Sequence, residues 1–143
     1  MAKATTAILL AAGEGKRMVS KKQKVMHNLC GRPMLGWVMR SVQQHITERP
    51  IVVLGFDGES VKDYFGKDCT YAYQQNVPGN RVDALRAGMS AVNADTGYVL
   101  VMAGNMPLIT DRTVAALVEA ANGFSASRLI CFSDDEDTLI SPA

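Results

Sequence analysis

A glycine-rich segment followed by several cations is the part of the sequence that most clearly indicates a chemical function. Residues 10–18 have the sequence LAAGEGKRM, and Lys24 follows six positions later. Gly13 and Gly15 allow backbone N–H groups to turn toward an anion without interference from a Cβ atom. Arg17 and Lys24 supply positive charge for the same anion. The segment therefore predicts a phosphate-binding loop.

Two well-known phosphate loops do not match this pattern. A Walker A loop has four residues between its glycines and a Ser or Thr that holds magnesium, whereas here one residue separates the glycines and Arg17 takes the place of the hydroxyl. A dinucleotide fingerprint has a third glycine where this chain has Met18, and its helix begins at once. The loop is therefore of a different phosphate-binding kind.

The elements that must position this loop alternate between strands and helices. Short apolar runs predict buried strands over residues 5–12, 51–55, 70–74, 98–103 and 129–132. Apolar residues at three- and four-residue spacing predict a helix over about 33–47, with Pro33 at its first position, and a second helix from about Asp57. This order predicts a parallel sheet joined by helical crossovers.

Two further helices are predicted in the second half of the chain. Asn80 can cap the first, and Thr110 can cap the second. The apolar face of the first is expected to comprise Val82, Leu85, Met89 and Val92. That of the second is expected to comprise Val114, Leu117, Val118 and Ala121.

These elements predict a single α/β domain over residues 1–143, with a three-layer, mostly parallel sheet of Rossmann-like type and helices on both faces. Ligands of such sheets bind at the carboxyl ends of the strands. We therefore expect the segments 13–24, 74–80 and 104–107 to lie along one rim.

Composition narrows the class of protein. The 143 residues are 48% hydrophobic and 20% charged, which is typical of a soluble globular domain. No apolar run approaches the roughly 20 residues that span a bilayer, so no membrane is expected. Three widely spaced cysteines predict a cytoplasmic protein without a disulfide framework. Residues 1–50 carry nine basic and two acidic side chains, but aromatic residues do not alternate with them, so no nucleic acid is expected as a partner.

The segments 10–18, 24–27 (KVMH) and 31–35 (GRPML) together resemble the opening of the sugar-1-phosphate nucleotidyltransferases. This family includes the MobA-like enzymes and the N-acetylglucosamine-1-phosphate uridylyltransferases, whose product is UDP-N-acetylglucosamine. The resemblance implies nucleotidyl transfer from a nucleoside triphosphate to a sugar-1-phosphate, with release of pyrophosphate. It implies that Arg17 and Lys24 are the catalytic cations. It also implies that the nucleotide lies against Leu10, Ala11, Ala12, Gly13, Glu14 and Gly15.

The resemblance continues through most of the chain. Gln74 and Gly79 resemble the family's base-recognition turn, in which Asn80 would also contact the nucleotide. Residues 99–110 resemble the strand that ends in Gly-Asp-x-Pro-Leu, and Asn105 stands at the position of the aspartate that holds Mg²⁺ in the family. The resemblance therefore implies Mg²⁺ as cofactor and Asn105 as a weakened metal ligand.

Several positions depart from the family pattern. Asn105 is neutral where a hard cation favours a carboxylate, and Arg81 stands where the family has a glycine in the base-recognition turn. Gln23 replaces a proline before Lys24. The family domain also continues into sugar-binding strands beyond the point that corresponds to Ala143, so a C-terminally shortened domain is expected.

These departures leave three functional hypotheses open. The first is an enzyme of the family type, acting on a nucleoside triphosphate and a sugar-1-phosphate. The second is a catalytically impaired nucleotide-binding or regulatory module. The third is one part of a split enzyme, in which a homo-oligomer or a partner chain completes the sugar site.

Other candidate residues have simpler structural interpretations. His27 and Cys30 are spaced like half of a metal site, but no second pair follows. Trp37 is expected to pack within its helix, and Asp111 to compensate a helix dipole, with a substitute metal ligand as the alternative for Asp111.

Overall fold

The computed structural model describes residues 4–12, 24–55, 58–75, 81–122 and 130–131. Its centre is a five-stranded parallel sheet with the strand order β5-β4-β1-β6-β7. The strands are β1 (Thr5–Ala11), β4 (Ile51–Leu54), β5 (Thr70–Tyr73), β6 (Tyr98–Ala103) and β7 (Ile130–Cys131). This sheet confirms the predicted α/β class.

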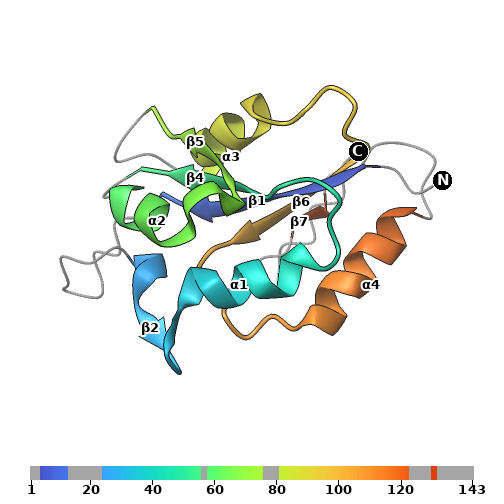
Figure 1. Cartoon of the computed structure of the whole chain (residues 1–143). Coiled ribbons are helices and arrows are strands. Elements are labelled where there is room, and N and C mark those ends of the chain that lie inside the picture. Colours follow the sequence, from blue (N-terminus) through green and yellow to red (C-terminus); the bar gives the residue numbers. More distant parts are fainter. Residues whose placement is uncertain (1–3, 13–23, 56–57, 76–80, 123–129, 132–143) are drawn as a thin grey trace.

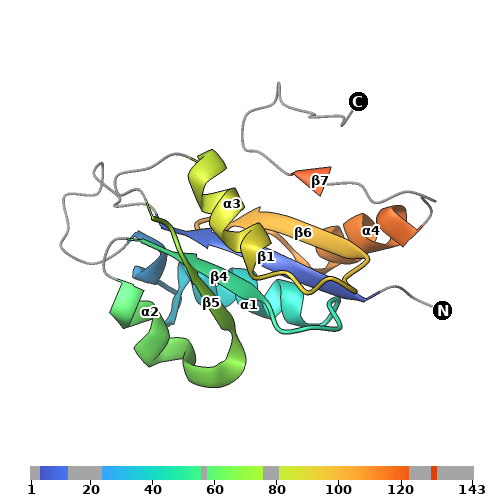
Figure 2. The same cartoon turned by 90° about the horizontal axis from the view of Figure 1, so that it is seen from above.

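Helices cover both faces of the sheet, as Figures 1 and 2 show. Helices α1 (Met34–Gln43), α2 (Gly58–Phe65) and α4 (Asp111–Asn122) share one apolar cluster with the side chains that β1 sends to that face. Helix α3 (Arg81–Ser90) packs on the opposite face, over Ile8 and Val53. The three layers follow from the strand sequences, because strands that are apolar at successive positions must be covered on both sides.

The strand order creates a switch point between β1 and β6. After β1 the chain adds β4 and β5 on one side, and then crosses to the other side of β1 to add β6. Crossovers that leave in opposite directions open a crevice at the carboxyl ends of the two central strands. We therefore expect a ligand to bind between the carboxyl ends of β1 and β6.

The predicted apolar face of α3 is wrong in part. Val82 is 61% exposed and Met89 is 44% exposed, whereas Ala84 is buried. Gly88 lies so close to the sheet that an added Cβ would approach Ile8 Cγ2 to 2.6 Å. The helix packs through its small residues because these permit close approach to β1. Leu85 and Val92 pack against the apolar cluster that contains Ile8, as predicted, whereas Val82 and Met89 are turned outward.

Helix α1 is also shorter than the predicted span of 33–47. Pro33 precedes the helix as its N-cap residue rather than occupying its first turn, and Gln44 is the C-cap. The helix cannot continue to Thr47, because the backbone N–H groups of Thr47 and Glu48 both donate to the Thr5 carbonyl at 2.9 and 3.1 Å. This contact joins the end of α1 to the start of β1.

A small hairpin before α1 was not predicted. Strand β2 (Asn28–Leu29) pairs antiparallel with β3 (Arg32–Pro33), after a short 3₁₀ helix, η2 (Lys24–Met26). The two residues of the turn both have positive φ, 51° at Cys30 and 82° at Gly31, as a two-residue hairpin turn requires. Cysteine is an unusual residue in this conformation, so Gly31 is the one residue of the turn that is typical of a hairpin.

A second 3₁₀ helix, η3 (Gly66–Asp68), joins α2 to β5. Among the described residues, no helix is long and apolar enough to cross a bilayer.

Replacing Gly88 by alanine tests the close packing of α3 on the sheet. The new methyl group would meet Ile8, which is fully buried and has no room to move. We expect Gly88→Ala to lower the free energy of unfolding by about 1–3 kcal/mol in urea titrations, although alanine favours helix. The control is Met89→Ala at the next, exposed position, which should change the stability by less than about 1 kcal/mol. Equal stabilities of the two variants would contradict the close contact.

Candidate functional site

The carboxyl ends of β1 and β6 are joined directly at the switch point. Leu10 pairs with Ala103 in the parallel register, and the next amide, that of Gly104, donates a 2.9 Å hydrogen bond to the Leu10 carbonyl. Leu10 and Ala12 are half-buried and Ala11 is buried. The predicted nucleotide-binding residues of β1 therefore end beside the segment that contains Asn105.

Gly104 is needed for this close approach. A Cβ atom at Gly104 would lie 3.0 Å from the Leu10 carbonyl oxygen and 3.1 Å from both Leu35 Cδ1 and Val25 Cγ1. Three separate segments thus converge on a position that has no side chain: the end of β1, helix α1 and η2. Any side chain here would press on backbone that is already hydrogen-bonded.

The residues that follow Lys24 pack at the carboxyl end of β6. Val25 and Met26 are buried in the core under α1, and Val25 is the residue that contacts Gly104. The turn is closed by the His27 amide, which donates to the Lys24 carbonyl at 3.3 Å. Lys24 itself is half-buried. Lys24, the predicted catalytic lysine, therefore directly precedes a residue that packs at the end of β6, although β1 and η2 are separated by twelve residues.

The rim extends from β1 toward the edge strand. Gly55, at the end of β4, would bring an added Cβ to 2.9 Å from the Ala12 carbonyl oxygen, so β4 closes tightly against the start of the glycine loop. Gln74 follows β5, is 8% exposed, and donates its backbone N–H to the Leu54 carbonyl at 2.8 Å. Two strand spacings, about 10 Å, separate β5 from β1 in the sheet. Gln74 is therefore on the predicted rim.

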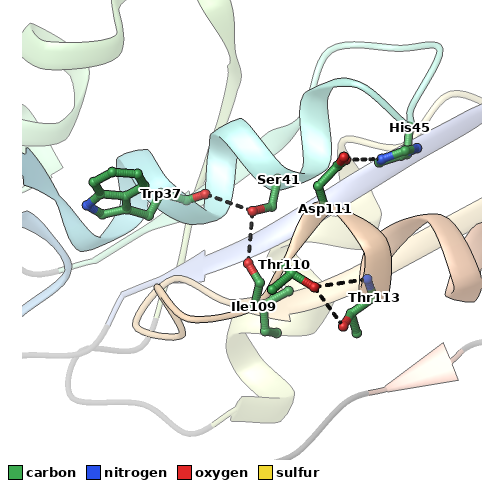
Figure 3. Close-up of polar contacts among 7 residues, drawn as sticks. All are labelled: Trp37, Ser41, His45, Ile109, Thr110, Asp111 and Thr113. Atoms are coloured by element: carbon green, nitrogen blue, oxygen red, sulfur yellow. Dashed lines mark hydrogen bonds and ion pairs between the residues drawn. The ribbon is translucent and has the colours of Figure 1, made fainter.

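The loop that carries Asn105 is held to α1 by a serine, as Figure 3 shows. Ser41 donates its hydroxyl to the Ile109 carbonyl at 2.9 Å and also lies 3.2 Å from the Trp37 carbonyl of its own helix. The opposite end of the loop is held by the Gly104 hydrogen bond to Leu10. Asn105 is half-buried between these two attachments.

The start of α4 matches its prediction. The Thr113 amide donates to Thr110 Oγ1 at 3.3 Å, so Thr110 caps the helix as expected. Asp111 lies in the first turn, where it compensates the dipole, and it forms a hydrogen-bonded ion pair with His45 beyond the end of α1 (Figure 3). Asp111 thus helps to join α1 to α4.

Other predicted site residues fall outside the described part of the chain. These are Gly13, Glu14, Gly15, Arg17, Gly79 and Asn80. Among the described residues, the structure joins Leu10 to Gly104, which precedes Asn105, and packs Val25, which follows Lys24, against the same glycine. Gln74 lies at the carboxyl end of β5, on the same edge of the sheet. Ser41 and Gly55 were missed by the sequence reasoning. Their hydrogen bond and close contact depend on segments far away in the sequence, which no local pattern reveals.

The donor chemistry at Asn105 does not make a metal site by itself. An amide offers one neutral oxygen, whereas Mg²⁺ binds through carboxylates together with substrate phosphates. Within the described residues, no group of three or more His, Cys, Asp or Glu side chains could hold a metal ion. His27 and Cys30 likewise belong to no such group.

Comparison with known proteins shows the family to which this chain is related. The profile of the MobA-like NTP transferase domain matches residues 7–142, nearly the whole chain. The chain belongs to this family. It is 39% identical over 131 residues to the bifunctional protein GlmU of Geobacillus thermodenitrificans and 41% identical over 109 residues to that of Acetivibrio thermocellus. These matches cover 90% and 76% of this chain, but only 28% and 23% of the two relatives, so the domain spans about a quarter of their length.

Solved structures show the same fold. A 4-diphosphocytidyl-2C-methyl-D-erythritol synthase from Anaerococcus prevotii is 25% identical and superposes with a TM-score of 0.68, covering 85% of this chain and 52% of that one. A nucleotidyl transferase from Methanothermobacter is 23% identical, with a TM-score of 0.67 and coverage of 81% and 57%. This nucleotidyltransferase-like domain therefore corresponds to somewhat more than half of each of these structures.

Removing the Ser41 hydroxyl tests the attachment of the Asn105 loop. Without this donor, the half-buried Ile109 carbonyl loses its partner, and we expect Ser41→Ala to lower the free energy of unfolding by about 1–2 kcal/mol. Amide hydrogen exchange of residues 104–110 should become faster than in the unmodified protein. The matched control is Ser90→Ala, whose exposed hydroxyl donates only to Ala87 of its own helix. If both variants exchange alike in this loop, Ser41 does not hold it.

Proposed function

We propose that this domain binds a nucleoside triphosphate at the rim between β1 and β6 and transfers its nucleotidyl group to a sugar-1-phosphate. The observation that carries the proposal is the convergence of the Leu10 carbonyl, Val25 and Leu35 on Gly104 at the switch point, which joins the end of β1, the segment after Lys24 and the start of the Asn105 loop. The GlmU relatives and the sequence resemblance support UTP and N-acetylglucosamine-1-phosphate as the substrates. The odd number and wide spacing of the three cysteines, which indicate no disulfide framework, support a cytoplasmic location.

The proposed reaction needs positioning and charge stabilisation above all. An oxygen of the acceptor phosphate attacks the α-phosphorus and forms a new P–O bond. The bond from the α-phosphorus to the bridging oxygen breaks, and pyrophosphate leaves with the electron pair. Lys24 and Arg17 would neutralise the negative charge that spreads over the phosphates in the transition state.

Backbone groups and side chains of the rim would hold the rest of the nucleotide. We assign the phosphates and base to Leu10, Ala11, Ala12, Gly13, Glu14 and Gly15, because amide N–H groups in a glycine-rich turn bind anions. Gln74, Gly79 and Asn80 would recognise the base. The position of Gln74 at the carboxyl end of β5, two strands from β1, supports this role.

A second candidate function is a nucleotide-binding or regulatory module. It is favoured by Asn105, which lacks the charge that would draw Mg²⁺ to the phosphates. A related form of the proposal is a split enzyme, in which a second copy or another chain supplies the sugar site.

Thermal shifts with nucleotides test the binding site and the role of Asn105. We expect one of the four nucleoside triphosphates, UTP on our assignment, to raise the Tm, because a ligand of the native state stabilises it by mass action. In Asn105→Asp, the shift with Mg²⁺ should exceed that without Mg²⁺, whereas the natural protein should show little difference. Asn28→Asp adds the same charge at an exposed position outside the rim and should behave as the natural protein. No shift with any nucleotide, in any variant, would remove the nucleotide site from consideration.

Release of pyrophosphate distinguishes an enzyme from a binding module. We expect turnover of UTP with N-acetylglucosamine-1-phosphate, and a loss of at least about 100-fold in Lys24→Gln, because a charge contact at the transferring phosphate is removed. Lys67→Gln, in the exposed η3 segment before β5, is the control and should retain full activity. A thermal shift without pyrophosphate release from any of the four triphosphates would support the binding module and exclude the enzyme.

A further inference from the structure

A groove lies between α1, the β2–β3 turn and the segment 107–111. It has a volume of about 500 Å³, and its walls include Leu29, Trp37, Arg40, Leu108 and Ile109. Ser41 lies in the same wall and joins α1 to Ile109 beneath it. The groove and the proposed nucleotide rim therefore share one loop, with Asn105 at the rim and Leu108 and Ile109 in the wall of the groove.

The surface of this groove is unusually apolar. Leu108 is 85% exposed and Leu29 is 39% exposed, and both border the half-buried ring of Trp37. Single exposed apolar residues are ordinary, but a contiguous group with an aromatic ring is typical of a binding surface.

The Trp37 ring is fixed in place rather than loosely packed. Its indole N–H donates to the Leu29 carbonyl at 2.7 Å, which ties the β2–β3 hairpin to α1. The guanidinium carbon of Arg32 lies 4.9 Å from the ring centroid, and that of Arg40 lies 6.0 Å from it. Both distances are suitable for cation–π contact, so two cations are held beside the aromatic ring.

Gly36 contributes to this arrangement. A Cβ at Gly36 would come within 2.7 Å of Arg32 Cγ and 3.1 Å of its Cδ, so the Arg32 stem lies against the helix backbone. Glycine inside a helix costs about 1 kcal/mol relative to alanine. Here it allows Arg32 to reach the Trp37 ring, and the surface is thus organised before any partner binds.

The charges around the groove favour an anionic partner. Among the described residues, no carboxylate forms an ion pair with Arg32 or Arg40. Asp111, at one end of the groove, is already paired with His45. A symmetric contact with a second copy would bring four arginines together, and such juxtaposition of like charges disfavours a homodimer through this face.

We propose that this groove binds an acidic segment of a partner protein that carries a large apolar side chain. The apolar side chain packs on Leu29, Trp37 and Leu108, and flanking carboxylates pair with Arg32 and Arg40. Arginine and tryptophan are the side chains that most often dominate such interfaces. The proposal does not depend on nucleotide turnover.

Trp37 makes the binding directly measurable, because it is the only tryptophan of the chain. The probe is a synthetic hexapeptide with two aspartates, a central Leu-Phe pair and two glutamates. We expect a saturable change in Trp37 emission and, in Arg32→Gln/Arg40→Gln, a dissociation constant at least tenfold higher. The control Arg49→Gln/Arg86→Gln removes the same charge from exposed positions outside the groove and should bind within twofold of the natural protein. Normal binding by the groove variant would overturn the proposal.

Further measurements distinguish binding of the apolar side chain of the peptide from simple attraction of anions to the arginines. Leu108→Ser should weaken binding about fivefold or more, and it tests the groove even if the double arginine variant fails to fold. A matched peptide with lysines in place of the acidic residues should not bind. An equal response to tripolyphosphate alone would make this an anion site and overturn the proposal. So would sedimentation that shows a dimer whose dissociation changes Trp37 emission, because a second copy would then occupy the groove.

Discussion

The pairing of β1 with β6 is the contact on which the rest of the structure depends. The strands before β6 are added on one side of β1, and β6 is the first strand on the other side. The hydrogen bond from the Gly104 amide to the Leu10 carbonyl joins the carboxyl ends of the two strands. The lack of a side chain at Gly104 then lets Val25 and Leu35 approach the same position. One backbone contact therefore joins the end of β1 to the start of the Asn105 loop, and Val25, which follows Lys24, packs beside it.

The loop after β6 has two sides with different chemistry. One side carries Asn105 at the rim, where the proposed nucleotide would bind. The other carries Leu108 and Ile109, which form one wall of the groove with Trp37. Because Ser41 holds this loop from α1, the hairpin, the helix and the loop form one continuous framework. The small hairpin thus links the proposed nucleotide rim to the proposed docking groove.

The electrostatic balance of the rim differs from that expected of a metal-dependent transferase. In the proposed site, Lys24 and Arg17 would provide cations for phosphate, whereas Asn105 would provide only a neutral oxygen to a metal ion. Phosphate binding and metal binding would therefore depend on separate residues. A domain of this family can in principle keep the first property when the second is weakened, which is why binding and turnover need separate measurements.

Much of the fold was determined by local sequence pattern. Continuous apolar runs predicted the buried strands, and the alternation of strands with helical periods predicted parallel pairing and a single functional rim. The capping role of Thr110 also followed from its own neighbourhood. The glycines and cations of residues 13–24 predicted phosphate binding from residue type alone, although Lys24 is the only one of them that the structure describes.

Only the tertiary structure decided the features that depend on distant contacts. Helix α3 packs through Ala84 and Gly88 because it approaches Ile8 closely, and of the apolar residues that periodicity favoured, Val82 and Met89 are turned outward. Helix α1 ends early because Thr5 takes the amides that would extend it. Ser41 and Gly36 have no distinctive local sequence signal, since their roles depend on Ile109 and on the path of the Arg32 side chain. Sequence periodicity describes which residues can be buried, whereas close approach between segments determines which of them are.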